Sequence, residues 1–90
     1  MKRVYLRVSG VVQGVGFRYY VYYTAQRLGL TGWVRNCCDD AIEMEAQGED
    51  GAVAQFRAAV ARGPRYAQVE QVDCTPLACI EERSFEIADW

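Results

Sequence analysis

The sequence predicts an α+β fold in which two helices cover one face of an antiparallel sheet. Three observations lead to this prediction. Several segments alternate apolar and polar side chains, two others carry apolar side chains at helical spacing, and Gly- or Pro-containing stretches separate them. The resulting order is β-α-β-β-α-β with a short C-terminal strand appended, which is typical of the ferredoxin-like α/β sandwich.

The first half of the chain predicts two strands with a helix between them. Strict alternation over residues 4–8 indicates a half-buried strand, and the three glycines of residues 10–16 end regular structure there. From Phe17 onward apolar residues recur at helical spacing, and Gly29 is the expected residue just beyond the helix end. Residues 31–36 are rich in β-forming side chains and predict the second strand.

The second half predicts a hairpin turn, a second helix and further strands. Asp39 and Asp40 fit the turn of a hairpin, because aspartate is common in such turns. Glu49 and Asp50 suit a helix N-terminus, where negative charge complements the helix dipole. The other expected features are a strand over 42–46, a helix end at 62–64, strands over 69–75 and 84–88, and a loop near Pro76.

Charged residues on the strands have a simple expected role. Arg3, Arg7, Arg27 and Arg35 could extend a positive field, but solvated strand and helix faces are the simpler interpretation. Glu43 and Glu45 share one face of a predicted strand and are likewise expected to be solvated.

Length and charge limit the class of protein. The 90 residues predict a single domain spanning residues 1–90, and the absence of heptads favours a monomer. No apolar run reaches the roughly 18 residues of a membrane span, and the N-terminus lacks the apolar core of a signal peptide. We therefore expect a cytoplasmic protein with no membrane partner. The net charge of −2 argues against a nucleic-acid partner.

Histidine and cysteine usage excludes several chemistries. The chain has no histidine, which excludes a Ser-His-Asp triad, a Cys-His pair and a His-ligated zinc. The four cysteines, Cys37, Cys38, Cys74 and Cys79, form no CxxC pair, so reduced thiols and no metal site are expected. The sequence leaves open a disulfide that joins Cys37 or Cys38 to Cys74 or Cys79.

The segment between the first strand and the first helix has the composition of an anion site. Its glycines allow backbone N–H groups to turn inward together, and the following helix N-terminus adds unpaired N–H donors. Arg18 lies in the first turn of that helix, where a guanidinium can bind phosphate oxygens in bidentate fashion. The segment is neither a Walker A loop nor a dinucleotide fingerprint. The alternative is a tight connection beside a solvated arginine.

Asn36 is the second candidate functional residue. It shares a strand face with Val34, so if Val34 faces the core, Asn36 faces inward at the strand end. One interpretation is an amide that orients a water molecule. The other is an asparagine that shapes the turn before Asp39 and Asp40.

Taken together, these motifs resemble the acylphosphatase family. The resemblance covers nearly the whole chain and rests on Gly10, the runs 12–18 and 29–36, and the closing segment 84–87. It implies metal-free and cofactor-free hydrolysis of the carboxyl–phosphate bond of acyl phosphates, with no covalent intermediate. By this resemblance, Arg18 matches the phosphate-binding arginine and Asn36 the residue that positions the attacking water. The backbone N–H groups matching the phosphate cradle are those of Gln13, Gly14, Val15, Gly16 and Phe17.

The chain differs from the family pattern beside Asn36. Residues 37–42 read Cys-Cys-Asp-Asp-Ala-Ile, where the family more often has a polar residue and an Asp-Gly turn. Because of this difference, an alternative function is a non-catalytic phosphate-binding regulatory module on the same fold. A third possibility, an RNA-binding domain, needs exposed aromatic residues on two central strands and a basic surface. Tyr5 is the only aromatic residue on those strands, so the sequence argues against it.

Overall fold

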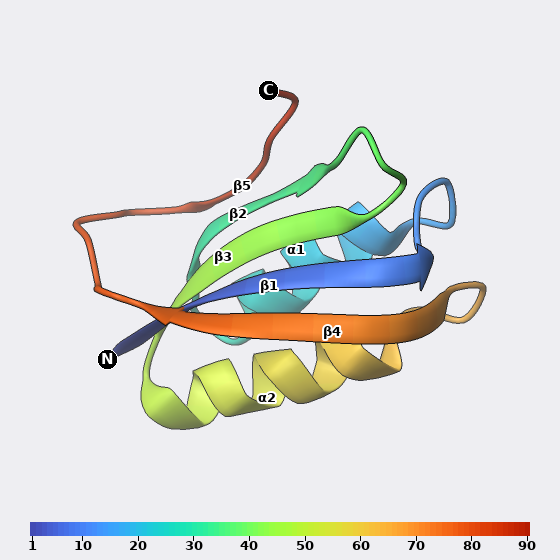
Figure 1. The fold of residues 1–90 in the computed structure, drawn as a ribbon. Helices are drawn as coiled ribbons and strands as arrows, with labels where there is room; N and C mark the ends of the chain where they lie inside the picture. Colours follow the sequence, from blue (N-terminus) through green and yellow to red (C-terminus); the bar gives the residue numbers. More distant parts are fainter.

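The computed structural model describes residues 1–90, which form two helices and one five-stranded sheet (Figure 1). The elements follow the predicted order, and the strand order across the sheet is β4-β1-β3-β2-β5. Both helices pack on the same face of the sheet, as predicted (Figure 1). The bounds are β1 (Lys2–Val11), α1 (Phe17–Arg27), β2 (Thr31–Asn36), β3 (Ile42–Gly48), α2 (Asp50–Arg62), β4 (Gln68–Leu77) and β5 (Phe85–Ile87).

The four long strands are antiparallel, as the ferredoxin-like order requires. The appended strand β5 differs, because it pairs parallel with β2, with Gly32 opposite Phe85. The connection between β4 and β5 carries the chain to the far edge of the sheet, and β5 then runs alongside β2 in the same direction (Figure 1). The sheet is therefore mixed rather than purely antiparallel.

Two strands extend beyond their predicted ends. β1 continues through Gly10, where its register against β4 shifts. Gly10 has a φ of +127°, and a Cβ placed there would lie 2.1 Å from the carbonyl oxygen of Gln68, so this close approach requires glycine. β4 continues through Pro76, which pairs with Val4, whereas a loop was predicted there. Proline is tolerated because β4 is an edge strand, where its missing N–H leaves no partner unsatisfied.

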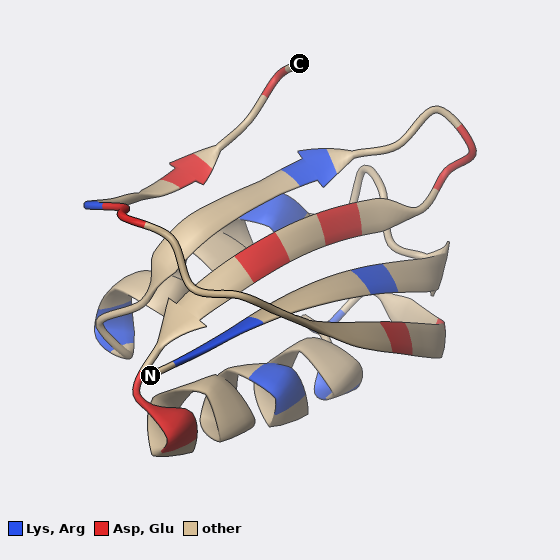
Figure 2. Ribbon diagram, turned by 60° about the vertical axis from the view of Figure 1, so that its left-hand side comes forward, with Lys and Arg blue, Asp and Glu red and all other residues tan.

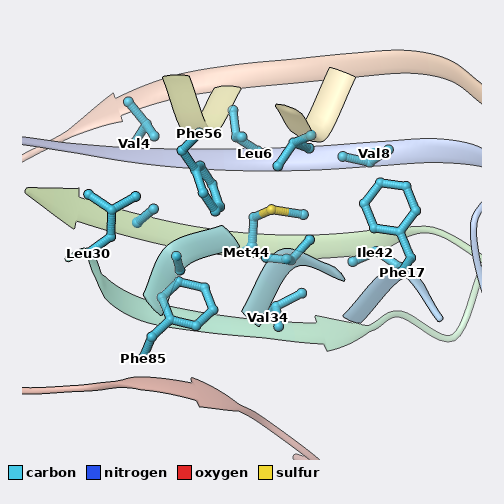
Figure 3. Close-up of a cluster of buried hydrophobic side chains, with 14 of the residues drawn as sticks. Val4, Leu6, Val8, Phe17, Leu30, Val34, Ile42, Met44, Phe56 and Phe85 are labelled. Carbon is cyan, nitrogen blue, oxygen red and sulfur yellow. The ribbon is translucent and has the colours of Figure 1, made fainter. Parts of the chain in front are cut away.

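The hydrophobic core lies between the sheet and the two helices (Figure 3). Alternate residues of the strands point toward the helices, and each helix packs one stripe of buried residues against them. Burying each large apolar side chain stabilises the fold by roughly 1.5–3 kcal/mol. The largest fully buried residues are Phe17, Phe56, Phe85, Leu6, Ile42, Met44, Val8, Val12, Val21, Val34, Val53 and Val60.

Several charged residues lie on the sheet strands (Figure 2), and on the face opposite the helices they form ion pairs rather than standing alone in solvent. Arg3 is only 3% exposed, and its guanidinium donates to Glu45 at 2.8 Å and Glu82 at 2.7 Å. Arg35 pairs with Glu43, which also accepts a 2.7 Å hydrogen bond from the Tyr5 hydroxyl. The expectation of solvated side chains was wrong for Arg3 because the β4–β5 connection folds over this face.

Candidate active site

The predicted site residues meet at one end of the sheet. The loop between β1 and α1 and the hairpin between β2 and β3 lie side by side there (Figure 1). A cavity of about 100 Å³ opens between them, lined by Val12, Gly14, Gly16, Phe17, Arg18, Tyr19, Asn36 and Ile42. A larger hollow of about 590 Å³ lies near the chain's N-terminus, between β1, β4 and α2. No predicted site residue lines that hollow, so we assign the site to the smaller cavity.

The loop has the backbone conformation expected of an anion cradle. Gly14 and Gly16 adopt φ values of +73° and +78°. A Cβ at either position would meet no atom within 4 Å, so the backbone conformation rather than space favours glycine. Gly16 is the N-cap of α1, no side chain caps the helix, and its first turn holds no acidic residue. The helix therefore presents unpaired N–H donors and its positive dipole end at the cavity.

Arg18 adds a charge to this cradle. It lies in the first turn of α1, is half-buried and lines the cavity. Each of the five ion pairs in the structure uses other groups, so no carboxylate neutralises the Arg18 guanidinium. Its N–H donors are therefore available to an anion held in the cradle.

Asn36 lines the same cavity from the last position of β2. It lies on the same strand face as Val34, as predicted, but it is exposed whereas Val34 is fully buried. Because Asn36 is exposed and lines the cavity, its side chain lies at the cavity rather than in the core. The side chain of Asn36 makes no hydrogen bond within the turn. That role belongs to Asp39, whose carboxylate accepts a 3.4 Å bond from the N–H of Ala41.

The β2–β3 hairpin is closed by a 2.8 Å hydrogen bond from the Cys37 N–H to the Ala41 carbonyl. Asp40 takes the left-handed conformation, with a φ of +71°, where an Asp-Gly turn would place glycine. Aspartate tolerates this conformation better than most residues, so the predicted turn forms without a glycine. At the tip of the hairpin, Asp39 also pairs with Arg7, which holds the pKa of that carboxyl below its usual value.

A contact that the sequence did not predict joins the loop to this hairpin. The Gln13 side-chain amide donates to the carbonyl oxygens of Cys37 and Ala41, both at 2.8 Å. The sequence assigned Gln13 only a backbone role in the cradle. No periodicity or motif signals such a contact, because it joins residues 24 and 28 positions apart in the chain.

The cysteines form neither a disulfide nor part of a metal site. All four thiols are free, which answers the question the sequence left open. Burial, with the nearby Glu43 carboxylate, raises the pKa of the Cys37 thiol, so it is a poorer nucleophile than an ordinary cysteine. No three His, Cys, Asp or Glu side chains lie close enough together to hold a metal ion. No helix has the length and apolar character needed to cross a membrane.

The fold and this cavity define a small ferredoxin-like protein with a glycine-lined cavity that contains Arg18 and Asn36 at one end of its sheet. Comparison with known proteins narrows that class. The Acylphosphatase family model matches residues 4–87. A curated acylphosphatase of Bifidobacterium longum is 46% identical over 80 residues, which are 89% of this chain and 82% of that protein. One from Geobacillus thermodenitrificans is also 46% identical and covers 97% of this chain and 94% of its own length.

Solved structures agree with the sequence comparisons. The crystal structure of acylphosphatase from Bacillus subtilis superposes with a TM-score of 0.95 at 36% identity, covering 99% of this chain and 100% of that one. The chain belongs to the acylphosphatase family. It is accordingly a hydrolase that converts an acyl phosphate, a small-molecule substrate, to a carboxylate and inorganic phosphate.

Proposed function

We propose that Arg18, Asn36 and the backbone N–H groups of residues 13–17 catalyse this hydrolysis by direct attack of water on phosphorus. The observation that supports the proposal is that Arg18, Asn36, Gly14 and Gly16 line the same cavity. In this assignment the cradle and Arg18 hold the phosphate, and the Asn36 amide orients the attacking water.

The chemistry suits a site without a strong acid or base. The leaving group is a carboxylate, whose conjugate acid has a pKa near 4, so it departs without protonation by the enzyme. Phosphoryl transfer depends mainly on positioning and on stabilising charge at the equatorial oxygens, which N–H donors and a guanidinium provide. In this mechanism the substrate's own phosphate accepts the proton from water. No histidine is needed.

The proposal also covers the cofactors, oligomeric state, compartment and partners of the protein. We infer metal-independent and cofactor-free catalysis, because the residues that line the cavity include no carboxylate, thiol or imidazole ligand. Residues 1–90 act as one domain around one core cluster and as a monomer. Four free cysteines are consistent with a reducing compartment such as the cytoplasm. A net charge of −2 favours neither nucleic acid nor a membrane surface as a partner.

Hydrolysis of benzoyl phosphate in the presence of EDTA tests this mechanism directly. The kcat of the wild type should be the same with and without EDTA. Asn36→Ala should lower kcat by about 10²–10³-fold, because the attacking water is no longer oriented. Gln71→Ala, which alters an exposed amide on β4, is the matched control and should retain full activity.

Three results would contradict the proposal. Full activity of a folded Asn36→Ala variant would remove Asn36 from the mechanism, and inactivation by EDTA would show that a metal takes part. If the folded wild type bound inorganic phosphate without turnover, the chain would instead be a non-catalytic anion-binding module.

A further inference from the structure

The two halves of the proposed site come from strands that are not neighbours. The phosphate loop follows β1, Asn36 ends β2, and β3 lies between these strands in the sheet. Backbone pairing therefore does not connect the loop directly to the strand that carries Asn36. The sheet relates the two strands only through β3, where Ile42 pairs with both Val8 and Asn36, so the position of the loop beyond β1 depends on its contacts with the β2–β3 hairpin.

The Gln13 amide provides this connection. Both of its hydrogens are used, one on the Cys37 carbonyl and one on the Ala41 carbonyl, each at 2.8 Å. These two residues form the closing pair of the hairpin, and Cys37 directly follows Asn36. Two bonds from one planar group fix both the distance and the orientation of the hairpin relative to the loop. The opposite amide orientation would set an oxygen against two carbonyl oxygens.

No other hydrogen bond joins residues 12–18 to residues 36–41. Arg7 reaches the same hairpin at two points: an ion pair with Asp39 at the exposed tip of the turn, and a 3.7 Å contact with the Cys37 Sγ, which is only a weak acceptor. Exposed pairs of this kind are weak and adopt several geometries. The half-buried Gln13 amide is thus the contact best placed to hold Asn36 at a fixed distance from the cradle.

We infer that Gln13 is a positioning residue for this hydrolysis, acting through its side chain on the placement of Asn36 and its water. This inference rests on the proposed mechanism above. It predicts a specific pattern, because the cradle N–H groups and Arg18 are retained when only the Gln13 amide is removed. Phosphate binding should survive and the rate of the chemical step should fall.

The test compares Gln13→Met and Gln13→Glu with wild type, using benzoyl phosphate as substrate and inorganic phosphate as inhibitor. Methionine keeps the side-chain length without donors, and glutamate keeps the shape with an ionised acceptor. We expect kcat to fall by about 10–100-fold in both, since a displacement of about 1 Å can cost that much. The inhibition constant of phosphate should stay within about two-fold for Gln13→Met, because it keeps the cradle's charge. Gln26→Met, which removes an amide donor bonded to Tyr22 on α1, is the matched control.

A pH profile separates positioning from general destabilisation. As the pH falls, the carboxylate introduced by Gln13→Glu takes up a proton and regains one donor. Its kcat relative to wild type should therefore rise toward pH 5, whereas that of Gln13→Met should not. Circular dichroism confirms that each variant is folded.

Other outcomes would overturn the inference. Unchanged kcat in both variants would show that the amide does not matter, and a parallel loss of phosphate binding in Gln13→Met would show that it shapes the cradle instead. If Asn36→Ala were itself fully active, the failure would lie with the proposed mechanism rather than with Gln13.

Discussion

Arg3 and Arg18 show how the two ends of this small sheet differ. Arg3 lies on the sheet face opposite the helices, where it is buried beneath the β4–β5 connection. Its guanidinium pairs with Glu45 and Glu82, so its charge is already neutralised. Arg18 lines an open cavity beside glycines and an uncapped helix end, with no carboxylate partner. The same side chain stabilises the fold at one end and is available to a ligand at the other. The placement of acidic residues decides which role an arginine has.

Parallel substitutions of the two arginines should separate activity from stability most strongly. Arg18→Gln should lower kcat/KM by about 10³-fold, equivalent to about 4 kcal/mol, because charge stabilisation of the transition state is lost. Its free energy of unfolding should change by no more than about 0.5 kcal/mol. Arg3→Gln should cost about 2–3 kcal/mol of stability, because Glu45 and Glu82 lose their partner. Urea unfolding and benzoyl phosphate turnover measure the two effects.

The folded Arg3→Gln variant should keep near-wild-type kcat/KM. A large loss of activity in that variant, or a strongly destabilised Arg18→Gln, would show that the two ends are not separable in this way.

Two glycines show the same contrast between a position that the fold depends on and a position in the proposed site. A Cβ at Gly32 in β2 would lie 1.9 Å from the carbonyl oxygen of Glu45, a backbone atom that cannot move away without breaking the sheet. Gly32→Ala should therefore cost about 3–4 kcal/mol of stability. A Cβ at Gly14 meets nothing, so Gly14→Ala should cost only about 1 kcal/mol, for its positive φ. Thermal and urea unfolding of both variants test this, and equal losses would contradict it.

The smallest predicted effect depends on pH. The Tyr5 hydroxyl donates to Glu43 and, with Arg35, holds the pKa of that carboxyl below its ordinary value of 4.5. A lowered pKa in the folded state means that the stabilisation is fully present above pH 4.5 and is lost as the pH falls toward the folded value. Glu43→Gln removes this pH-dependent contribution. As the pH falls below 4.5, the variant should therefore lose about 1 kcal/mol less of its free energy of unfolding than the wild type loses. Urea unfolding between pH 3 and 7 measures it, and parallel curves would contradict it.

Local patterns predicted the helices and strands better than the contacts between them. Alternation, helical spacing and the glycine run are local, so they located the strands, the helices and the glycine loop that precedes Arg18. Strand alternation correctly placed Asn36 on the same face as Val34, but the side chain is exposed rather than turned inward, which alternation within one strand cannot reveal. The parallel direction of β5, the burial of Arg3 and the Gln13 contact all depend on residues distant in sequence, where no pattern within a segment can report them.

The short parallel strand β5 has a consequence for how copies of the chain meet in solution. Without it, six residues of β2 would offer free backbone groups to a neighbouring molecule. β5 covers that side with only three residues of its own, too few to template a stable partner strand. The other border of the sheet, β4, is longer, but Pro76 interrupts its row of donors, and the charges of Glu70 and Asp73 repel a second copy. A short edge strand at one border and an edge proline with flanking acidic residues at the other are both features that disfavour edge-to-edge pairing of sheets.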